Sequence, residues 1–321
     1  MVNTRHLLTS LALLFAAGTA CAGDLPPLPE AWRSEQGRDH PLVGTIHDTA
    51  ANKRVAPETL IDRLSRARFI LLGETHTNPD HHRHQAWVLR ALAAHGRSPA
   101  VVWEMIGADQ ADALRRFQAE PDADAAELGE ALAWAESGWP AWRLYRPIAE
   151  AALAHDLPMR AGAPGEAERG AIAHDGVAEL DDTTRRSLAL DEPLPPPLRD
   201  GLRKRLATAH CGDIPADVVD SMLAMQRLRD ATLADNLIRA AETAGSAVLV
   251  AGSGHVRGDW GVPWYLRQRD ASGVVTVAFR EVRPDAHEPS AYLPDGADRR
   301  GLDLVWFTPR AEASEHECSG S

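Results

Sequence analysis

Short apolar runs rich in β-branched residues constrain the fold of this chain more than any other feature. Each run is apolar throughout instead of alternating with polar residues, which is typical of strands covered on both faces of a parallel sheet. Helical periodicity fills the segments between them, at residues 57–67, 80–94 and 221–244. The sequence therefore predicts an α/β fold, a mainly parallel sheet flanked by helices. Its strands are expected at residues 68–72, 100–103, 247–251, 274–279 and 304–307, with a weaker strand at 158–161.

The composition changes between about residues 107 and 235. This stretch is rich in Ala, Glu, Asp and Arg, carries an aromatic series at Trp139, Trp142 and Tyr145, and is interrupted by the Pro-rich segment DEPLPPPLRD. We expect a large helical insertion within a single α/β domain that spans residues 23–321. The polar end of the chain, about residues 311–321, is expected to be disordered.

The first 22 residues have the layout of a secretory signal. Arg5 precedes the apolar run LLTSLALLFAAG, which is too short to span a bilayer, and small residues follow it. Two processing routes remain open. One is cleavage at the small residues around Cys21, and the other is lipidation of Cys21, for which Gly18 makes the lipobox imperfect. Either route predicts an exported protein, periplasmic or anchored to an outer membrane.

The net charge and the cysteines limit the kinds of partner and the cysteine chemistry that this chain can have. Without residues 1–22, which contain one Arg and no acid, the net charge moves from −12 to −13, which argues against nucleic acid as a partner. Cys211 and Cys318 are the other two cysteines of the chain. In an oxidising compartment they predict a disulfide, whereas His210 and Cys211 together form a candidate ligand pair, and both interpretations stay open.

Residues capable of acid–base or metal chemistry follow three of the predicted strands. Gly73-Glu74-Thr75-His76 follows the first strand, Glu104 the second, and Gly252-Ser253-Gly254-His255 a later one. In an open parallel sheet, ligands collect beyond the carboxyl ends of the strands. Two G-x-x-H motifs and two strand-end carboxylates therefore predict a convergent site, because Glu and His suit a divalent metal or a proton-transfer pair.

The histidines that follow are weaker candidates. Asn78 and Pro79 form a good helix start, so His81, His82 and His84 are expected to be mostly solvated, with His82 the best candidate of the three. No G-x-S-x-G elbow, P-loop, H-E-x-x-H motif or strand-linked G-x-G-x-x-G motif is present in the sequence.

Read together, the motifs resemble the ChaN-like haem-binding lipoproteins of the haem-uptake, Tiki superfamily. The resemblance implies an exported protein that binds haem for iron acquisition, often lipid-anchored, with a homodimer and an outer-membrane haem receptor as expected partners. The wider superfamily includes Tiki-type metalloproteases. Carried over to this sequence, their active centre implicates Glu74, His76, Glu104, residues 252–255 and Asp230. If Asp230 is not part of it, Asp230 is expected to form a salt bridge with Arg227 or Arg229. The matching segments are ILLGETHTNPDHHRHQ, VVWEM, WPAWRLYRPIAEAA, AHCG, MQRLRDATLA and VLVAGSGHVRGDWGVPWYL.

Three hypotheses follow. The first is a haem-binding protein whose axial ligand is Tyr265, on an expected exposed aromatic rim, Tyr145, which the helical spacing places in the core, or His210. The resemblance implies tyrosine ligation without identifying the residue. The second is a metal-dependent hydrolase, with Glu74, His76, Glu104 and His255 as the catalytic residues. The third is a partner-binding lipoprotein with a vestigial site. The candidate metal ligands are Glu74, His76, His82, Glu104, Asp230 and His255.

Overall fold

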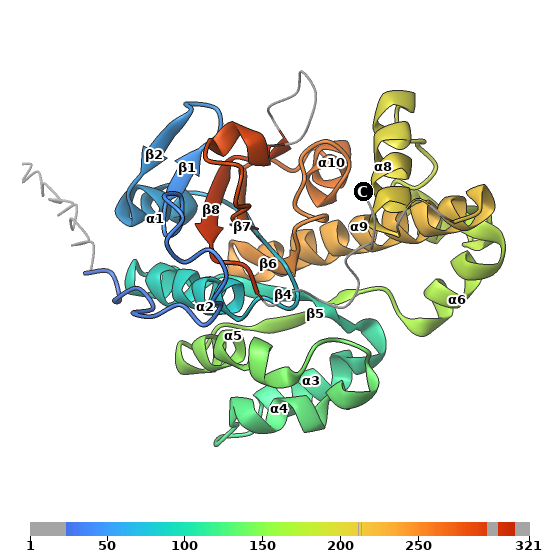
Figure 1. Ribbon diagram of the computed structural model, residues 1–321. Coiled ribbons are helices and arrows are strands. Elements are labelled where there is room, and N and C mark those ends of the chain that lie inside the picture. The colour runs from blue at the N-terminus through green and yellow to red at the C-terminus, as the bar shows by residue number, and fades with distance from the viewer. Residues whose placement is uncertain (1–23, 211, 213, 294–300, 312–321) are drawn as a thin grey trace, which may run out of the picture.

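An eight-stranded sheet forms the centre of the computed structural model, which describes residues 24–210, 212, 214–293 and 301–311. Figure 1 shows helices packed on both sides of this sheet. The strand order is β2-β1-β8-β7-β3-β6-β4-β5. The strands are β1 (Ile46–Asp48), β2 (Lys53–Val55), β3 (Phe69–Glu74), β4 (Ala100–Gly107), β5 (Met159–Ala163), β6 (Ala247–Gly252), β7 (Val274–Glu281) and β8 (Leu304–Thr308).

The prediction of a mainly parallel sheet is confirmed. Strands β3 to β8 pair in parallel, and all six predicted runs are strands. Strands β1 and β2, a short antiparallel hairpin that adds to β8, were not predicted. Each has three residues and β2 is largely exposed, so neither carries the apolar run that marks a covered strand.

The two faces of the sheet bury separate cores. In β3, Ile70 and Leu72 point to one core, and Phe69 and Leu71 to the other, as the two-residue period of a strand requires. Helices α1, α2, α3, α4 and α5 cover the first face, and α6, α8, α9 and α10 the second (Figure 1). The helices are α1 (Pro57–Ser65), α2 (Pro79–Ala94), α3 (Ala111–Gln118), α4 (Ala125–Ala131), α5 (Trp142–Ala154), α6 (Glu166–Asp175), α7 (Asp182–Ser187), α8 (Pro196–Ala209), α9 (Ala216–Ala244) and α10 (Val262–Gln268), with short 3₁₀ turns η1 (Ala108–Gln110), η2 (Trp134–Glu136), η3 (Gly176–Glu179) and η4 (Pro289–Tyr292).

The segment from 107 to 235 is mainly helical, as the sequence predicts, and strand β5 interrupts it. That this segment is an insertion within a single α/β domain stays a prediction. The predicted signal peptide, Cys21, Cys211, Cys318 and residues 312–321 lie outside the described residues. In the part of the chain that is described, no helix is long and apolar enough to cross a membrane.

Helix α2 begins where the sequence predicts, but its histidines are not solvated. The Asn78 side chain accepts hydrogen bonds from the backbone N–H groups of Asp80 (2.9 Å) and His81 (3.3 Å), and Pro79 is the first helical residue. His81, His82 and His84 are all buried, so the expected exposure was wrong. The physical reason is that the N-terminal segment and β8 cover this end of α2; Trp32 stacks on His84, with ring centroids 5.1 Å apart.

Candidate functional site

The candidate site lies at the topological switch point of the sheet, between β3 and β6. β3 and β6 are parallel neighbours, yet the helix after β3, α2, packs on one face and the helix after β6, α10, on the other. Such a switch point leaves a crevice beyond the carboxyl ends of the two strands. Strand order also places β6 between β3 and β4, so Glu74 and Glu104 flank the loop that carries His255.

Glu74, the last residue of β3, lies between two histidines. Its Oε1 accepts a hydrogen bond from Nδ1 of His76 at 2.8 Å, and its Oε2 pairs with Nε2 of His82 on α2. Glu74 and His82 are fully enclosed, whereas the His76 side chain keeps 31% of its surface exposed. His76 is therefore the member of this group that reaches solvent.

Glu104 forms the second half of the cluster. A register irregularity in β4 after Trp103 directs its carboxylate towards β6, where Oε2 accepts the backbone N–H of Gly252 at 2.7 Å. Its Oε1 lies 3.0 Å from Nε2 of His255, and Nδ1 of His255 lies 2.6 Å from Asp230 on α9. Asp230 thus lies beside His255, and among the described residues no ion pair joins it to Arg227 or Arg229; its role in a site stays a prediction.

The pKa values follow from burial opposed by these neighbours. Burial alone would raise the pKa of Glu74, but His82 and His76 outweigh it and the net shift is downward. The pKa of Glu104 is likewise held well below its usual range by His255 and His76 against its burial. Burial lowers the pKa of His255, but Glu104 and Asp230 reverse this and raise it to about 10. The central ion pair, Glu104 with His255, is therefore charged at neutral pH.

The two halves meet at His76 and Gly252. Nε2 of His76 lies 4.0 Å from Glu104 Oε2. A methyl group added to Gly252 would lie 2.8 Å from that same nitrogen, so glycine permits the close approach. The Tyr145 hydroxyl, from α5, lies 3.2 Å from Nδ1 of His76.

This geometry gives a buried chain of alternating acids and histidines. Each carboxylate in it, Glu74, Glu104 and Asp230, already has a histidine partner. Among the described residues, no group of three or more His, Cys, Asp or Glu side chains is arranged to hold a metal ion. The cluster suits proton storage or transfer, and the metal-dependent hydrolase lacks support from its geometry.

The two expected tyrosine ligands are enclosed. Tyr265 has no exposed surface, and its hydroxyl accepts a hydrogen bond from Arg227 at 3.2 Å, so the expected exposed aromatic rim around it was wrong. Tyr265 is buried because Val262–Leu266 of α10 pack on the second core. Tyr145 is fully buried in the first core, as its helical spacing predicts. His210, the residue after α8, is exposed.

Two hollows adjoin the helical insertion. A cavity of about 390 Å³ lies beside Glu104 and Arg229, and it shares Trp139 with a more apolar hollow of about 770 Å³, which we call the tryptophan pocket. The ring centroids of Trp139 and His76 are 4.8 Å apart. The tryptophan pocket is walled by Trp134, Trp139 and Trp142 with Ala126, Ala133, Ala135 and Ala141.

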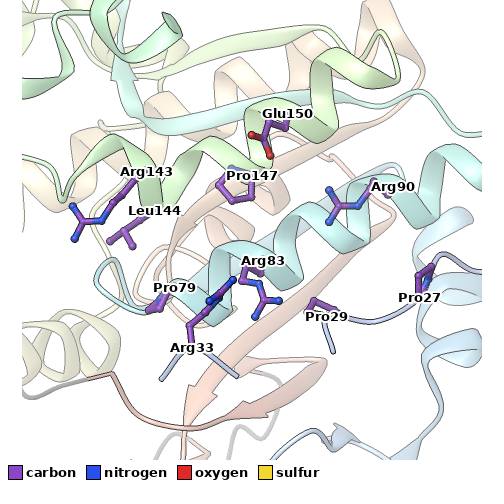
Figure 2. A pocket seen from close by; sticks show the side chains of 10 residues that line it. All are labelled: Pro27, Pro29, Arg33, Pro79, Arg83, Arg90, Arg143, Leu144, Pro147 and Glu150. Carbon is purple, nitrogen blue, oxygen red and sulfur yellow. The ribbon is translucent and has the colours of Figure 1, made fainter. Parts of the chain in front are cut away.

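Figure 2 shows a different hollow, of about 700 Å³, between the N-terminal segment, α2 and α5. Four arginines line it, Arg33, Arg83, Arg90 and Arg143, together with Glu150. Arg83 pairs with Asp80, and Glu150 favours the charged form of Arg90. Its charges are thus partly neutralised from within, and it does not adjoin the strand-end cluster.

Two residues of the cluster, Gln226 and Arg229, were not predicted from the sequence. Gln226, one helical turn before Asp230, donates to Asp230 Oδ2 at 3.2 Å and lies 3.1 Å from Nδ1 of His255. Arg229 approaches Glu104 at 4.0 Å. The i to i+4 spacing of Gln226 and Asp230 was visible in the sequence, but it becomes informative only once Asp230 is known to face the site.

The fold and this cluster define a class of protein, an α/β protein with a histidine–carboxylate chain at the switch point of a parallel sheet. The chain belongs to the family described as "Haem-binding uptake, Tiki superfamily, ChaN", which matches residues 60–266. The resemblance inferred from the sequence motifs is thereby confirmed.

Three solved structures were found to be similar to this chain, and the first of them supports the fold. A structure described as cofacial haem binding to ChaN of Campylobacter jejuni is similar, with a TM-score of 0.63 and 20% identity over 81% of this chain and 95% of that chain. The type III effector HopBA1 covers 78% of this chain and 92% of its own at 14% identity, with a TM-score of 0.41. A mutant of the erythromycin esterase EreC, in its open conformation, covers 76% and 81% at 14% identity, with a TM-score of 0.39. No curated protein matches the chain.

Proposed function

We propose that this protein is an exported haem-binding protein that takes part in haem or iron acquisition. The observation that carries the proposal is the family match over residues 60–266. The fold, shared with a ChaN that binds haem cofacially, supports it. The metal-dependent hydrolase is the weaker alternative, because each carboxylate of the cluster is already paired within the protein.

Among the candidate ligands, His210 is the one that is exposed. Its Nδ1 lies 2.8 Å from the carbonyl oxygen of Leu206, to which it donates, so Nε2 carries the free lone pair. Metal-bound histidines characteristically hold their second ring nitrogen in this way. Because His210 is exposed, a haem can reach it without rearrangement.

Tyrosine ligation is less favourable in this structure. Tyrosine binds haem iron as its phenolate, and burial raises the pKa of Tyr265 to about 12. Burial, Glu74 and Glu104 raise the pKa of Tyr145 further. Both hydroxyls are also engaged inside the protein, by Arg227 and beside His76. We therefore assign the axial ligand to His210.

A haem titration of the mature chain, residues 23–321, tests both parts of the proposal. Visible absorbance is expected to saturate at a fixed haem-to-protein ratio, and His210→Ala is expected to weaken binding at least about tenfold and shift the haem bands. His95→Ala is the matched control, since Nδ1 of His95 also bonds a helical carbonyl, that of Ala91, at 3.1 Å. It should bind like the wild type.

Two results would overturn these assignments. Binding that never saturates would remove the haem function. Binding that is unchanged in His210→Ala but lost in Tyr145→Phe or Trp139→Ala would move the haem to the tryptophan pocket. Tyr265→Phe tests the remaining candidate in the same titration.

The proposal also includes anchoring and assembly. An acyl chain on Cys21 would hold the protein at a membrane, where it would hand haem to or from an outer-membrane receptor, and haem would join two protomers. Incorporation of labelled palmitate that is abolished by Cys21→Ser tests the anchor. Sedimentation velocity with and without haem tests the dimer, and a monomer in both states would contradict it.

A further inference from the structure

A strongly basic cavity of about 510 Å³ lies between α8 and the loop after β6, and neither the strand-end cluster nor the Figure 2 hollow includes it. Lys204 and Arg205 come from α8, and Arg257 and Trp260 from the loop. Gly201, Thr208 and Ala209 complete the lining, and none of the described residues that line it is acidic. We call it the arginine cavity.

Arg257 is held rigidly in its wall. Its guanidinium donates to both carboxylate oxygens of Asp259, with Nε 2.9 Å from Oδ1, and its Cζ lies 3.8 Å above the ring of Trp260. Only 8% of Arg257 is exposed. Gly201 allows α8 to approach this wall, since a methyl group there would lie 3.2 Å from Trp260. The guanidinium is therefore fixed before any ligand arrives.

A third arginine adds to the charge. Arg280, on β7, is partly buried and donates to the hydroxyl of Ser253 at 2.8 Å, a neutral partner. Burial lowers the pKa of Arg280 to about 10, and repulsion from Arg205 and Arg257 contributes. Asp259 neutralises Arg257 and favours the charge on Arg205. Arg205 and Arg257 thus line the cavity, with Asp259 as the carboxylate paired to Arg257, and Arg280 lies near enough for its charge to be repelled by both.

Lys204 and Arg205 are exposed and Asp259 pairs with Arg257, so Arg280 is the partly buried cation, and its hydrogen-bond partner, Ser253, is neutral. Burying a cation without a counter-charge costs free energy. Proteins tolerate that cost where a ligand supplies the opposite charge, and arginine forks match the two oxygens of a carboxylate or phosphate. We propose that the arginine cavity is an oxyanion site, which binds a carboxylate or phosphate group of a small ligand. Two sources share this chemistry, the carboxylates of a porphyrin and a free phosphate compound. The oxyanion site itself does not depend on haem binding.

Isothermal titration of the mature chain with inorganic phosphate tests the site, at an ionic strength held constant with chloride. The wild type is expected to bind saturably, and Arg205→Gln to bind at least about tenfold more weakly. Arg115→Gln is the control: it also removes one cation, from an exposed ion pair with Asp112, and should leave phosphate binding unchanged. Phosphate binding that is absent in the wild type, or equal in Arg205→Gln, would overturn the proposal.

Arg280→Met separates a ligand-binding role from a structural one. If Arg280 is held for an anion, the variant melts at the wild-type temperature or above without phosphate, and phosphate no longer raises its melting temperature. A variant that melts lower and still responds to phosphate like the wild type would contradict the site.

Competition distinguishes the two sources. Protoporphyrin IX that displaces phosphate, while its dimethyl ester does not, would identify porphyrin carboxylates as the ligand. Phosphate that stays bound in the presence of both would identify a separate phosphate compound. Either result supports the oxyanion site, and a failure of haem binding in the earlier titration would leave it intact.

Discussion

Replacing Glu104 by Gln is the sharpest perturbation of the strand-end cluster. The substitution keeps the shape of the side chain but removes its charge and one acceptor oxygen. Oε1 faces Nε2 of His255 at 3.0 Å and Oε2 faces the backbone N–H of Gly252 at 2.7 Å. A Gln amide can accept from one of these donors only, so its NH₂ group must face the other. A buried imidazolium or a buried N–H is then left without its acceptor.

The size of the effect follows from the burial of the pair, since Glu104 is 3% and His255 6% exposed. Removing one partner of a buried, hydrogen-bonded ion pair lowers the free energy of unfolding by about 3–5 kcal/mol. Asp230 still neutralises His255, so we expect the lower end, about 3 kcal/mol at pH 7. Glu150→Gln, in the exposed pair with Arg146, should cost less than about 1 kcal/mol.

The pH dependence gives an independent check. His255 holds its proton more tightly in the folded state, because its pKa is raised to about 10 from an unfolded value of 6.5. Its contribution to stability is therefore complete below pH 6.5 and is lost as the pH rises towards 10, with a slope of up to about 1.4 kcal/mol per pH unit. Without the Glu104 charge, the pKa of His255 in the folded state is raised less above 6.5. The cost of Glu104→Gln should therefore fall by roughly 2 kcal/mol between pH 7 and pH 9.

Urea unfolding followed by circular dichroism at pH 7 and pH 9 measures both quantities. If Glu104→Gln lowers the free energy of unfolding by less than about 1 kcal/mol at pH 7, the Glu104–His255 ion pair is exposed to water and not buried. A cost of about 3 kcal/mol that is the same at both pH values would mean that Glu104 does not set the proton affinity of His255.

Two further substitutions test the packing around the site, both by urea unfolding. Gly252→Ala forces a methyl group against His76 and should cost about 1–3 kcal/mol, whereas Gly254→Ala, with open space around it, should be nearly neutral; equal costs would contradict the close approach. Asn78→Ala removes the cap of α2 and the hydrogen bonds of Asn78 to Glu281 and Pro309. It should lower the free energy of unfolding by about 2–4 kcal/mol. Loss of an exposed cap alone costs roughly 1 kcal/mol, so a cost no larger than that would show that the bonds to Glu281 and Pro309 add nothing.

Much of the fold was predictable from the sequence because parallel strands buried on both faces leave continuous apolar runs. The strands extend past their predicted runs, and β3 and β4 do so into site residues, since β3 ends at Glu74 and β4 continues through Glu104 to Gly107. Their polar residues belong to the site, so function interrupts the apolar pattern there. The hairpin of β1 and β2 was missed because three-residue edge strands carry little hydrophobic pattern.

Most residues of the cluster could be chosen from the sequence, except Gln226 and Arg229, but their pairings could not. The strand ends indicated Glu74, Glu104 and His255, yet their contacts depend on β6 lying between β3 and β4, which no local pattern encodes. His82 reaches Glu74 only because α2 packs directly over β3. The arginine cavity was missed for the same reason, since its cations come from α8 and from the loop after β6, two segments distant in the sequence.

Electrostatic balance separates the roles of the two sites. The strand-end cluster is neutralised from within, so an incoming cation would have to break ion pairs with His82 and His255 before it could bind. The arginine cavity has the opposite imbalance and is relieved by an anion. His210 directly follows Ala209, which lines that cavity, and Arg205 lies about one helical turn earlier. If the His210 imidazole turns towards this cavity, one ligand that carries both a metal centre and carboxylates would satisfy His210 and the arginines together. A simple phosphate would satisfy only the arginines, so the porphyrin competition decides whether the two proposals describe one binding site or two.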